Sequence, residues 1–146
     1  MPENSQSITT ITQVRVRYAD TDQMGIVYNG VYFVYFEIGR TELLRECGLP
    51  YSEIEKQGLM LPVLESHAVY KSPALYDDIL DIHTTFENLL KPTIRLDYKV
   101  FKNDIFIAEG YTVHSFLKAD IRRPVRPPKV FHEKIASYIE AQRGMK

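Results

Sequence analysis

The run VYFVYF at Val31–Phe36 is the feature that most constrains what this 146-residue chain can fold into. It opens a helical pattern that extends to Cys47, and Gly48 and Pro50 follow as a typical helix end. About 17 residues at roughly 1.5 Å each predict a helix about 25 Å long. A helix that is apolar on all sides is buried. The rest of the chain is therefore expected to surround this helix.

The remainder of the chain is mostly strand pattern, in which apolar and polar residues alternate. Strands are predicted over residues 10–18, 61–70, 78–88, 94–101 and 105–117. Short helices are predicted over 51–57 and 131–142, and the segment 120–128, rich in proline and arginine, is predicted to be a loop. The economical arrangement is an α+β fold in which a five-stranded antiparallel sheet wraps around one long central helix. We expect a single domain over residues 1–146.

Composition narrows the classes of function. Apolar residues make up 45% and charged residues 25% of the chain, and the formal net charge is −1, which disfavours binding to nucleic acid. One cysteine, Cys47, permits no internal disulfide and fits a reducing compartment. The first residues lack the pattern of a secretory signal, and no apolar run is long enough to cross a membrane. We expect a cytoplasmic protein without membrane insertion.

Two carboxylates, Asp20 and Asp22, lie in a polar turn between the first strand and the long helix. Asn29 is a residue type that often caps a helix, and Gly30 follows it. The start of a helix carries unpaired backbone N–H groups and the positive end of the helix dipole. An acid that faces such donors across a small gap is suited to attack on a polarised carbonyl carbon.

This pattern, together with the string DTDQMGIVYNGVYFVYFE, resembles the hotdog-fold acyl-CoA thioesterases of the 4-hydroxybenzoyl-CoA thioesterase family. The resemblance covers nearly the whole chain. Its further motifs are Tyr32…Tyr35-Phe36-Glu37, Arg40 with Glu42, Pro62-Val63…Glu65, Tyr70-Lys71-Ser72-Pro73-Ala74…Tyr76-Asp77-Asp78, and Arg123-Pro124-Val125-Arg126-Pro127. The resemblance implies hydrolysis of an acyl-CoA to free acid and CoA, without a metal or other cofactor. It also implies homodimers whose sheets join edge to edge, often paired into homotetramers.

In that family the second acid of the turn is catalytic, which implies Asp22 as nucleophile or general base. The family's backbone donor to the thioester oxygen falls on Asn29, and Gly30 is expected to donate beside it. Many relatives carry His or Tyr at this position, but the backbone N–H of Asn29 survives the change. The alternative is that Asp22 only stabilises its turn and that Asn29 only caps the helix. For Asp20 we expect a structural role that orients the turn.

Other residues have weaker assignments. Glu65 is expected either to position water or to pair with a nearby Arg or Lys. Tyr28, nearest to the turn, is predicted to line the acyl pocket. Tyr18, Tyr32 and Tyr35 suit either that pocket or the core.

Lys91 and Arg126 are predicted to bind the phosphates of CoA through charge-assisted hydrogen bonds. Arg122, Arg123 and Lys129 are weaker candidates for the same role. The competing interpretation is a basic loop that is merely solvated.

Several classes of function lack their motifs. The four histidines show no metal-ligand spacing, so no metal site is predicted, and G-x-S-x-G and G-x-G-x-x-G are absent. Hydratases of the same fold pair a histidine with an acid, but no histidine precedes His67. A non-catalytic module that binds or senses acyl-CoA stays open as an alternative. The sequence does not indicate which acyl group is bound.

Overall fold

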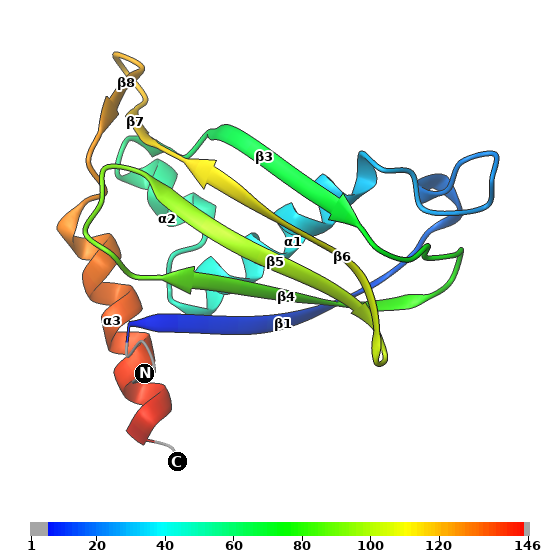
Figure 1. Ribbon diagram of the computed structural model, residues 1–146. Helices are drawn as coiled ribbons and strands as arrows, with labels where there is room; N and C mark the ends of the chain where they lie inside the picture. Colours follow the sequence, from blue (N-terminus) through cyan, green and yellow to red (C-terminus); the bar gives the residue numbers. More distant parts are fainter. Residues whose placement is uncertain (1–5, 145–146) are drawn as a thin grey trace.

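The computed structural model describes residues 6–144, and its main element is an antiparallel sheet (Figure 1). The sheet contains, in spatial order, β1 (Ser7–Arg15), β4 (Ile79–Glu87), β5 (Ile94–Lys102), β6 (Ile105–His114) and β3 (Val63–Tyr70). All four neighbouring pairs are antiparallel, with irregular register between Val63 and Glu65 and between Val100 and Phe101. The predicted five-stranded antiparallel sheet is therefore present.

Helix α1 (Val31–Glu46) packs on one face of this sheet. The ring of Phe36 stacks on that of Tyr98 from β5, with centroids 4.4 Å apart and planes inclined by 7°. Two glycines permit this approach. A Cβ on Gly39 would lie 2.3 Å from Thr84 Oγ1, and a Cβ on Gly110 would lie 2.7 Å from Phe36 Cε2. Both distances are far below van der Waals contact, so any larger residue would force helix and sheet apart.

The expectation that α1 is buried all round is wrong for part of its surface. Tyr32, Tyr35 and Phe36 are buried, but Val34 is 46% exposed and Glu37 is exposed. One sheet covers one face of a helix, and no element within residues 6–144 covers the opposite face near the start of α1. The prediction of the helix end is off by one residue, since Cys47 is the C-cap and Gly48 follows with φ +76°.

A small second sheet was not predicted. It contains β2 (Leu59–Met60), β7 (Phe116–Lys118) and β8 (Arg123–Val125), in that order. The segment 120–128 is therefore not wholly a loop, and the strand expected over 105–117 is two strands interrupted at Ser115. Strands β2 and β7 are distant segments, since Leu59 pairs with Lys118, and such a pairing has no signal in the local alternation of residues. Strands β7 and β8 form a short hairpin, in which Lys118 pairs with Arg123.

Two further helices flank the sheets. Helix α2 (Tyr51–Lys56) follows α1, and α3 (Lys129–Gly144) closes the described chain at one end of the large sheet (Figure 1). The closing helix predicted over 131–142 is present as α3, which is longer than predicted and has 16 residues, as many as α1. No helix among residues 6–144 is long and apolar enough to span a membrane.

The predicted first strand extended too far toward the turn. Tyr18 is 78% exposed and begins the 3-10 turn η1 (Tyr18–Asp20), whereas β1 ends at Arg15. The assignment of Asn29 as helix cap is also wrong. Gly30 is the N-cap of α1, with helical backbone angles and no side-chain capping bond. The helical geometry thus begins directly after the loop, without the usual side-chain acceptor.

Candidate functional site

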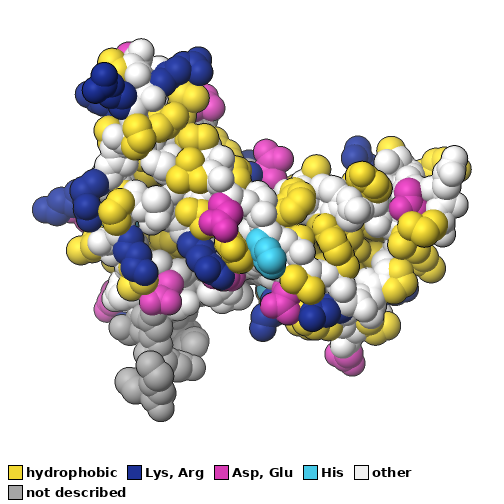
Figure 2. Space-filling model, turned by 45° about the horizontal axis from the view of Figure 1, so that its top comes forward, with side chains coloured by type: hydrophobic (Ala, Val, Ile, Leu, Met, Phe, Trp, Pro, Cys, Tyr) yellow, Lys and Arg dark blue, Asp and Glu magenta, His cyan; other side chains and the backbone are white. Residues whose placement is uncertain are grey.

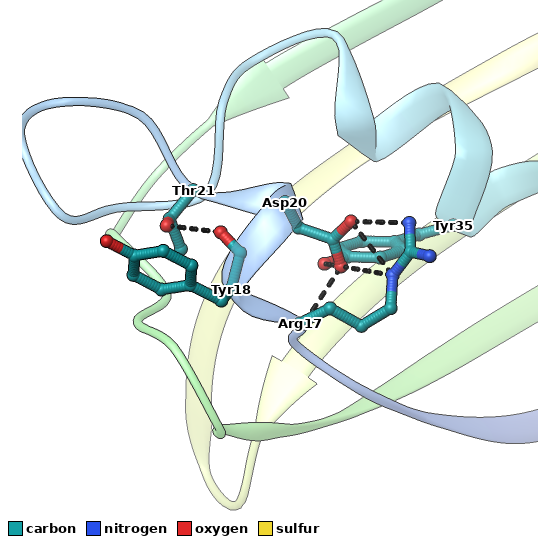
Figure 3. A network of polar contacts seen from close by, with 5 residues as sticks. All are labelled: Arg17, Tyr18, Asp20, Thr21 and Tyr35. Atoms are coloured by element: carbon teal, nitrogen blue, oxygen red, sulfur yellow. Dashed lines mark hydrogen bonds and ion pairs between the residues drawn. The ribbon is translucent and has the colours of Figure 1, made fainter.

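The carboxylate of Asp20 anchors the turn between β1 and α1 (Figure 3). Asp20 is 4% exposed and pairs with the Arg17 guanidinium at 2.9 Å. Its Oδ2 also accepts from the Arg17 N–H and from the Tyr35 hydroxyl of α1, each at 3.0 Å. Burial alone would raise the pKa of Asp20, but these donors from Arg17 and Tyr35 outweigh burial and lower that pKa. Asp20 is thus a buried, ionised carboxylate, and both of its oxygens accept hydrogen bonds.

Asp22 lies on the same turn but has a different environment. It is half-buried, and its Oδ1 accepts the N–H of Met24 at 2.8 Å. Its backbone N–H donates to the carbonyl of Ile26 at 3.0 Å. No described residue donates a hydrogen bond to the second carboxylate oxygen. Asp22 therefore has the turn contact of a structural acid and retains a free oxygen for chemistry.

The backbone at the start of α1 supplies donors next to this turn. The N–H groups of Asn29 and Gly30 donate to no residue of the described chain, whereas those of Val31 and Tyr32 donate to the carbonyls of Tyr28 and Asn29. The ring of Tyr28 covers Gly30, since a Cβ there would lie 3.2 Å from Tyr28 Cε2. Unpaired N–H groups at a helix start favour an anionic or strongly polarised oxygen.

Asp22 and Asn29 share one cleft of about 430 Å³. Its walls come from the turn, the start of α1 and the segment after β3. The lining residues are Asp22, Met24, Ile26, Val27, Asn29, Tyr32, Tyr70, Lys71, Ser72 and Pro73. A carboxylate and Asn29, whose backbone N–H is unpaired, thus border one partly apolar hollow. Such an arrangement suits attack on a polarised carbonyl.

Three further residues that line the cleft have no role predicted from the sequence: Tyr70, Lys71 and Ser72. Their signal was visible as the run Tyr70-Lys71-Ser72-Pro73-Ala74, which contributed only to the family resemblance. The Tyr70 hydroxyl donates to the Asn29 carbonyl at 3.0 Å, although the two residues are 41 positions apart. Only the fold brings them together.

The lining of this cleft lacks three residues that were predicted for the site beside Asp22: Glu65, Tyr28 and Gly30. Glu65 is exposed on β3 and accepts from the Tyr111 hydroxyl at 2.9 Å. It forms no ion pair with any described Arg or Lys, so the expected pairing is not found, and a role in positioning water stays a prediction. Tyr28 is 54% exposed and lies over Gly30 instead of in the cleft wall. Within one chain, neither side chain meets Asp22.

Lys91 and Arg126 share a second, open cleft of about 730 Å³. It lies between the β4–β5 connection, the segment after β8 and the start of α3, at the opposite end of the sheet from Asp22 (Figure 1). In Figure 2, hydrophobic side chains gather at the end with the turn before α1, and most Lys and Arg side chains gather at the other end. The structure brings the two predicted phosphate ligands together but separates them from Asp22 of the same chain.

The chain is similar to known thioesterases. The model of the thioesterase-like superfamily matches residues 16–135. YneP of Bacillus subtilis, provisionally named an acyl-CoA thioesterase, is 45% identical over 103 residues, which are 70% of this chain and 65% of YneP. The acyl-CoA thioesterase YbgC of Haemophilus influenzae is 28% identical over 117 residues, which are 80% of this chain and 86% of YbgC.

The fold is also shared with solved structures. The crystal structure of DHNA-CoA thioesterase from Staphylococcus aureus superimposes with a TM-score of 0.82 and 27% sequence identity. The match covers 94% of this chain and 95% of that protein.

Proposed function

The chain belongs to the thioesterase-like superfamily, and from that premise we propose that it hydrolyses acyl-CoA with the carboxylate of Asp22 and N–H donors at the start of α1. It is a thioester hydrolase of the hotdog fold, and its named relatives include acyl-CoA thioesterases. The observation that carries the proposal is that Asp22 and Asn29 line the same cleft. We also propose that the large sheet wraps around α1, and that the whole chain forms a single domain.

In the proposed reaction the thioester carbonyl oxygen accepts from the N–H groups of Asn29 and Gly30. Negative charge develops on this oxygen during attack, and the donors and the dipole of α1 stabilise it. One such donor contributes roughly 3–4 kcal/mol to transition-state stability in a known oxyanion site. The free carboxylate oxygen of Asp22 either attacks the thioester carbon to form an anhydride or removes a proton from the attacking water. CoA leaves as the thiolate and takes a proton from water. In the first route water then hydrolyses the anhydride, which releases the free acid and restores the Asp22 carboxylate; in the second route the attacking water itself becomes part of the free acid. Neither route requires a cofactor.

Thiol release from short, long and aromatic acyl-CoAs tests this proposal. The wild type is expected to release CoA from at least one class, and the Asp22→Asn variant is expected to bind that substrate without releasing CoA at a comparable rate. Binding without hydrolysis by the wild type would instead favour a binding or sensor module. Near-normal turnover by Asp22→Asn would remove Asp22 from the mechanism and make Glu65 the next residue to test.

We further propose that the working site is built from two subunits. Strand β3 is an edge strand with Val63 43% and Leu64 59% exposed, and an exposed edge is a template for pairing with another strand. Two copies of β3 paired antiparallel across a twofold axis would bring the Val63 end of one beside the Tyr70 end of the other. The basic end of one subunit, with Lys91 and Arg126, would then approach Asp22 of its partner.

Two experiments test the shared site. Light scattering is expected to give a homodimer or homotetramer, and a mass of 17.0 kDa at micromolar concentration would contradict it. Mixed dimers of Asp22→Asn with Arg126→Ala are the sharper test. If the site is shared, one of the two sites in each mixed dimer has both native residues, and it shows the wild-type KM. If each chain forms its own site, the mixture shows only the raised KM of Arg126→Ala.

We also propose a cytoplasmic location, because a chain with a single cysteine, which is free, fits a reducing compartment. Cys47 is a free, buried cysteine, and burial, followed by the charge of Glu46, raises the pKa of its thiol to about 12. A thiol that stays protonated and enclosed serves as a small apolar core group.

A further inference from the structure

Tyr70 connects the edge strand of the sheet to the start of α1. It is the last residue of β3 and pairs with Ala108 of β6. The two backbone N–H groups that follow, those of Lys71 and Ser72, both donate to the Ile107 carbonyl, at 2.8 and 3.1 Å. The position of Tyr70 is therefore fixed by the sheet. Its hydroxyl crosses to the helix start and donates to the Asn29 carbonyl at 3.0 Å.

The ring of Tyr70 is held as well as its backbone. It packs against Tyr32 of α1 with centroids 5.3 Å apart, and Tyr32 in turn packs against Tyr35 at 5.7 Å. Burial, followed by the influence of Tyr28, raises the pKa of Tyr70. The hydroxyl thus keeps its proton at neutral pH and acts as a donor in a fixed direction.

The Asn29 carbonyl belongs to the same peptide group as the Gly30 N–H. A peptide is planar, so a bond that fixes the carbonyl also fixes the direction of the N–H at the other end. Hydrogen bonds in a chain polarise one another, so a carbonyl that accepts makes its own N–H a stronger donor. This carbonyl accepts twice, from Tyr70 and from the Tyr32 N–H at 3.3 Å. The Gly30 N–H itself donates to no described residue.

We propose that Tyr70 is a positioning residue for thioester hydrolysis, acting through the Asn29–Gly30 peptide on the Gly30 N–H, which the proposed function assigns as a donor to the thioester oxygen. This inference rests on the proposed function and extends it to a residue of the distant strand β3. Tyr70 holds a peptide that must already be aligned when charge develops on the substrate oxygen. Its contribution is therefore made in the transition state and not in substrate binding.

Steady-state kinetics of Tyr70→Phe measure this contribution. The substitution keeps the ring and its packing and removes one neutral hydrogen bond, so kcat is expected to fall roughly 5- to 10-fold. KM for the same acyl-CoA is expected to change by less than about twofold. Tyr138→Phe is the matched control, because it removes from α3 a hydroxyl that donates to Glu46, the last residue of α1, at 2.7 Å. This control is expected to keep the wild-type kcat.

A spectroscopic readout separates positioning from a loss of folded protein. With acyl-CoA bound to Asp22→Asn, the infrared band of the thioester carbonyl is expected at lower frequency than in water. In the double variant with Tyr70→Phe, the band is expected to move back toward its position in water. With Tyr138→Phe in place of Tyr70→Phe, it is expected to stay.

The outcomes are distinct. The role of Tyr70 would be overturned by an unchanged kcat, by a fall in kcat that matches a fall in folded fraction, or by an unmoved carbonyl band. In each of these cases hydrolysis by the wild type still upholds the proposed function. If the wild type releases no thiol from any acyl-CoA, the proposed function fails first and the role of Tyr70 fails with it.

Discussion

The two ends of the molecule hold their charged groups in different ways. At the end with Asp22, the carboxylate of Asp20 is 4% exposed and is held by Arg17 and Tyr35. At the other end, Lys91 and Arg126 are exposed and form no ion pair with another residue among 6–144. Chemistry at a carbonyl depends on atoms placed within a fraction of an ångström, whereas attraction of phosphate depends mainly on charge. We therefore expect the first end to tolerate substitution poorly and the second to tolerate it well.

Asp22→Asn is expected to have the largest effect at the Asp22 end. The change keeps the size of the side chain and the contact to Met24 but removes the charge that attacks or activates water. Loss of a catalytic base or nucleophile lowers kcat by about 100-fold or more. Thermal unfolding is expected to stay close to that of the wild type. A comparable loss of kcat in Lys91→Ala would contradict the division of labour between the two ends.

The buried histidine at the basic end is expected to make stability depend on pH. His114 is fully buried and, through burial and then the charge of Arg40, its pKa falls to about 4. In the unfolded chain this histidine binds a proton near pH 6.5, whereas in the folded protein it stays neutral down to about pH 4. The free energy of unfolding is therefore highest above pH 6.5 and decreases as the pH falls toward 4. The shift corresponds to about 3 kcal/mol of unfolding free energy. Urea unfolding at several pH values measures it.

Two comparisons isolate this effect. His114→Gln is expected to flatten the dependence between pH 6.5 and 4, whereas His67→Gln, which removes an exposed histidine, is expected to keep it. Asp20, at the other end, has a lowered pKa, so its contribution is lost only below its ordinary value near 3.8. An equally steep dependence in His114→Gln would show that other groups cause it.

Asp20→Asn is expected to destabilise the fold more than it slows turnover. The variant removes a buried charge from Arg17 and Tyr35, and we expect a loss of about 2 kcal/mol of unfolding free energy. Asp97→Asn is the control, because it breaks an exposed pair with Arg95 at 3.0 Å and is expected to cost less than about 0.5 kcal/mol. Chemical denaturation measures both. Equal losses of unfolding free energy in the two variants would mean that the burial of Asp20 adds nothing to the strength of its ion pair.

Arg126→Ala is expected to have the smallest effect. If the cleft at the basic end binds CoA phosphates, KM for acyl-CoA rises several-fold with little change in kcat, because the contact is remote from the thioester. The rise is expected to shrink at high salt and to vanish with a short thioester that lacks the nucleotide. An unchanged KM at low salt would leave this cleft as a solvated basic surface.

Much of the fold follows from patterns that are local in the chain. The alternation in 94–101 predicted β5 closely, and Gly48 and Pro50 predicted the end of α1 to within one residue. Predictions failed where distant segments decide the outcome. Strand β2 exists because residues 59–60 pair with β7, and the turn before α1 is held by the hydrogen bond from Tyr35 to Asp20. Neither contact has a local signature.

The sequence by itself determined the polar turn with Asp20 and Asp22, the apolar helix after it and the family to which they belong. These depend on residue type and on spacing between near neighbours, which the chain carries directly. Only the tertiary structure decided that Asp20 is enclosed while Asp22 opens on a cleft, and that Lys91 and Arg126 lie at the opposite end. The physical reason is that burial and hydrogen bonding depend on partners far away in the chain. Tyr70 and Asn29 are 41 residues apart in the sequence and 3.0 Å apart in the fold.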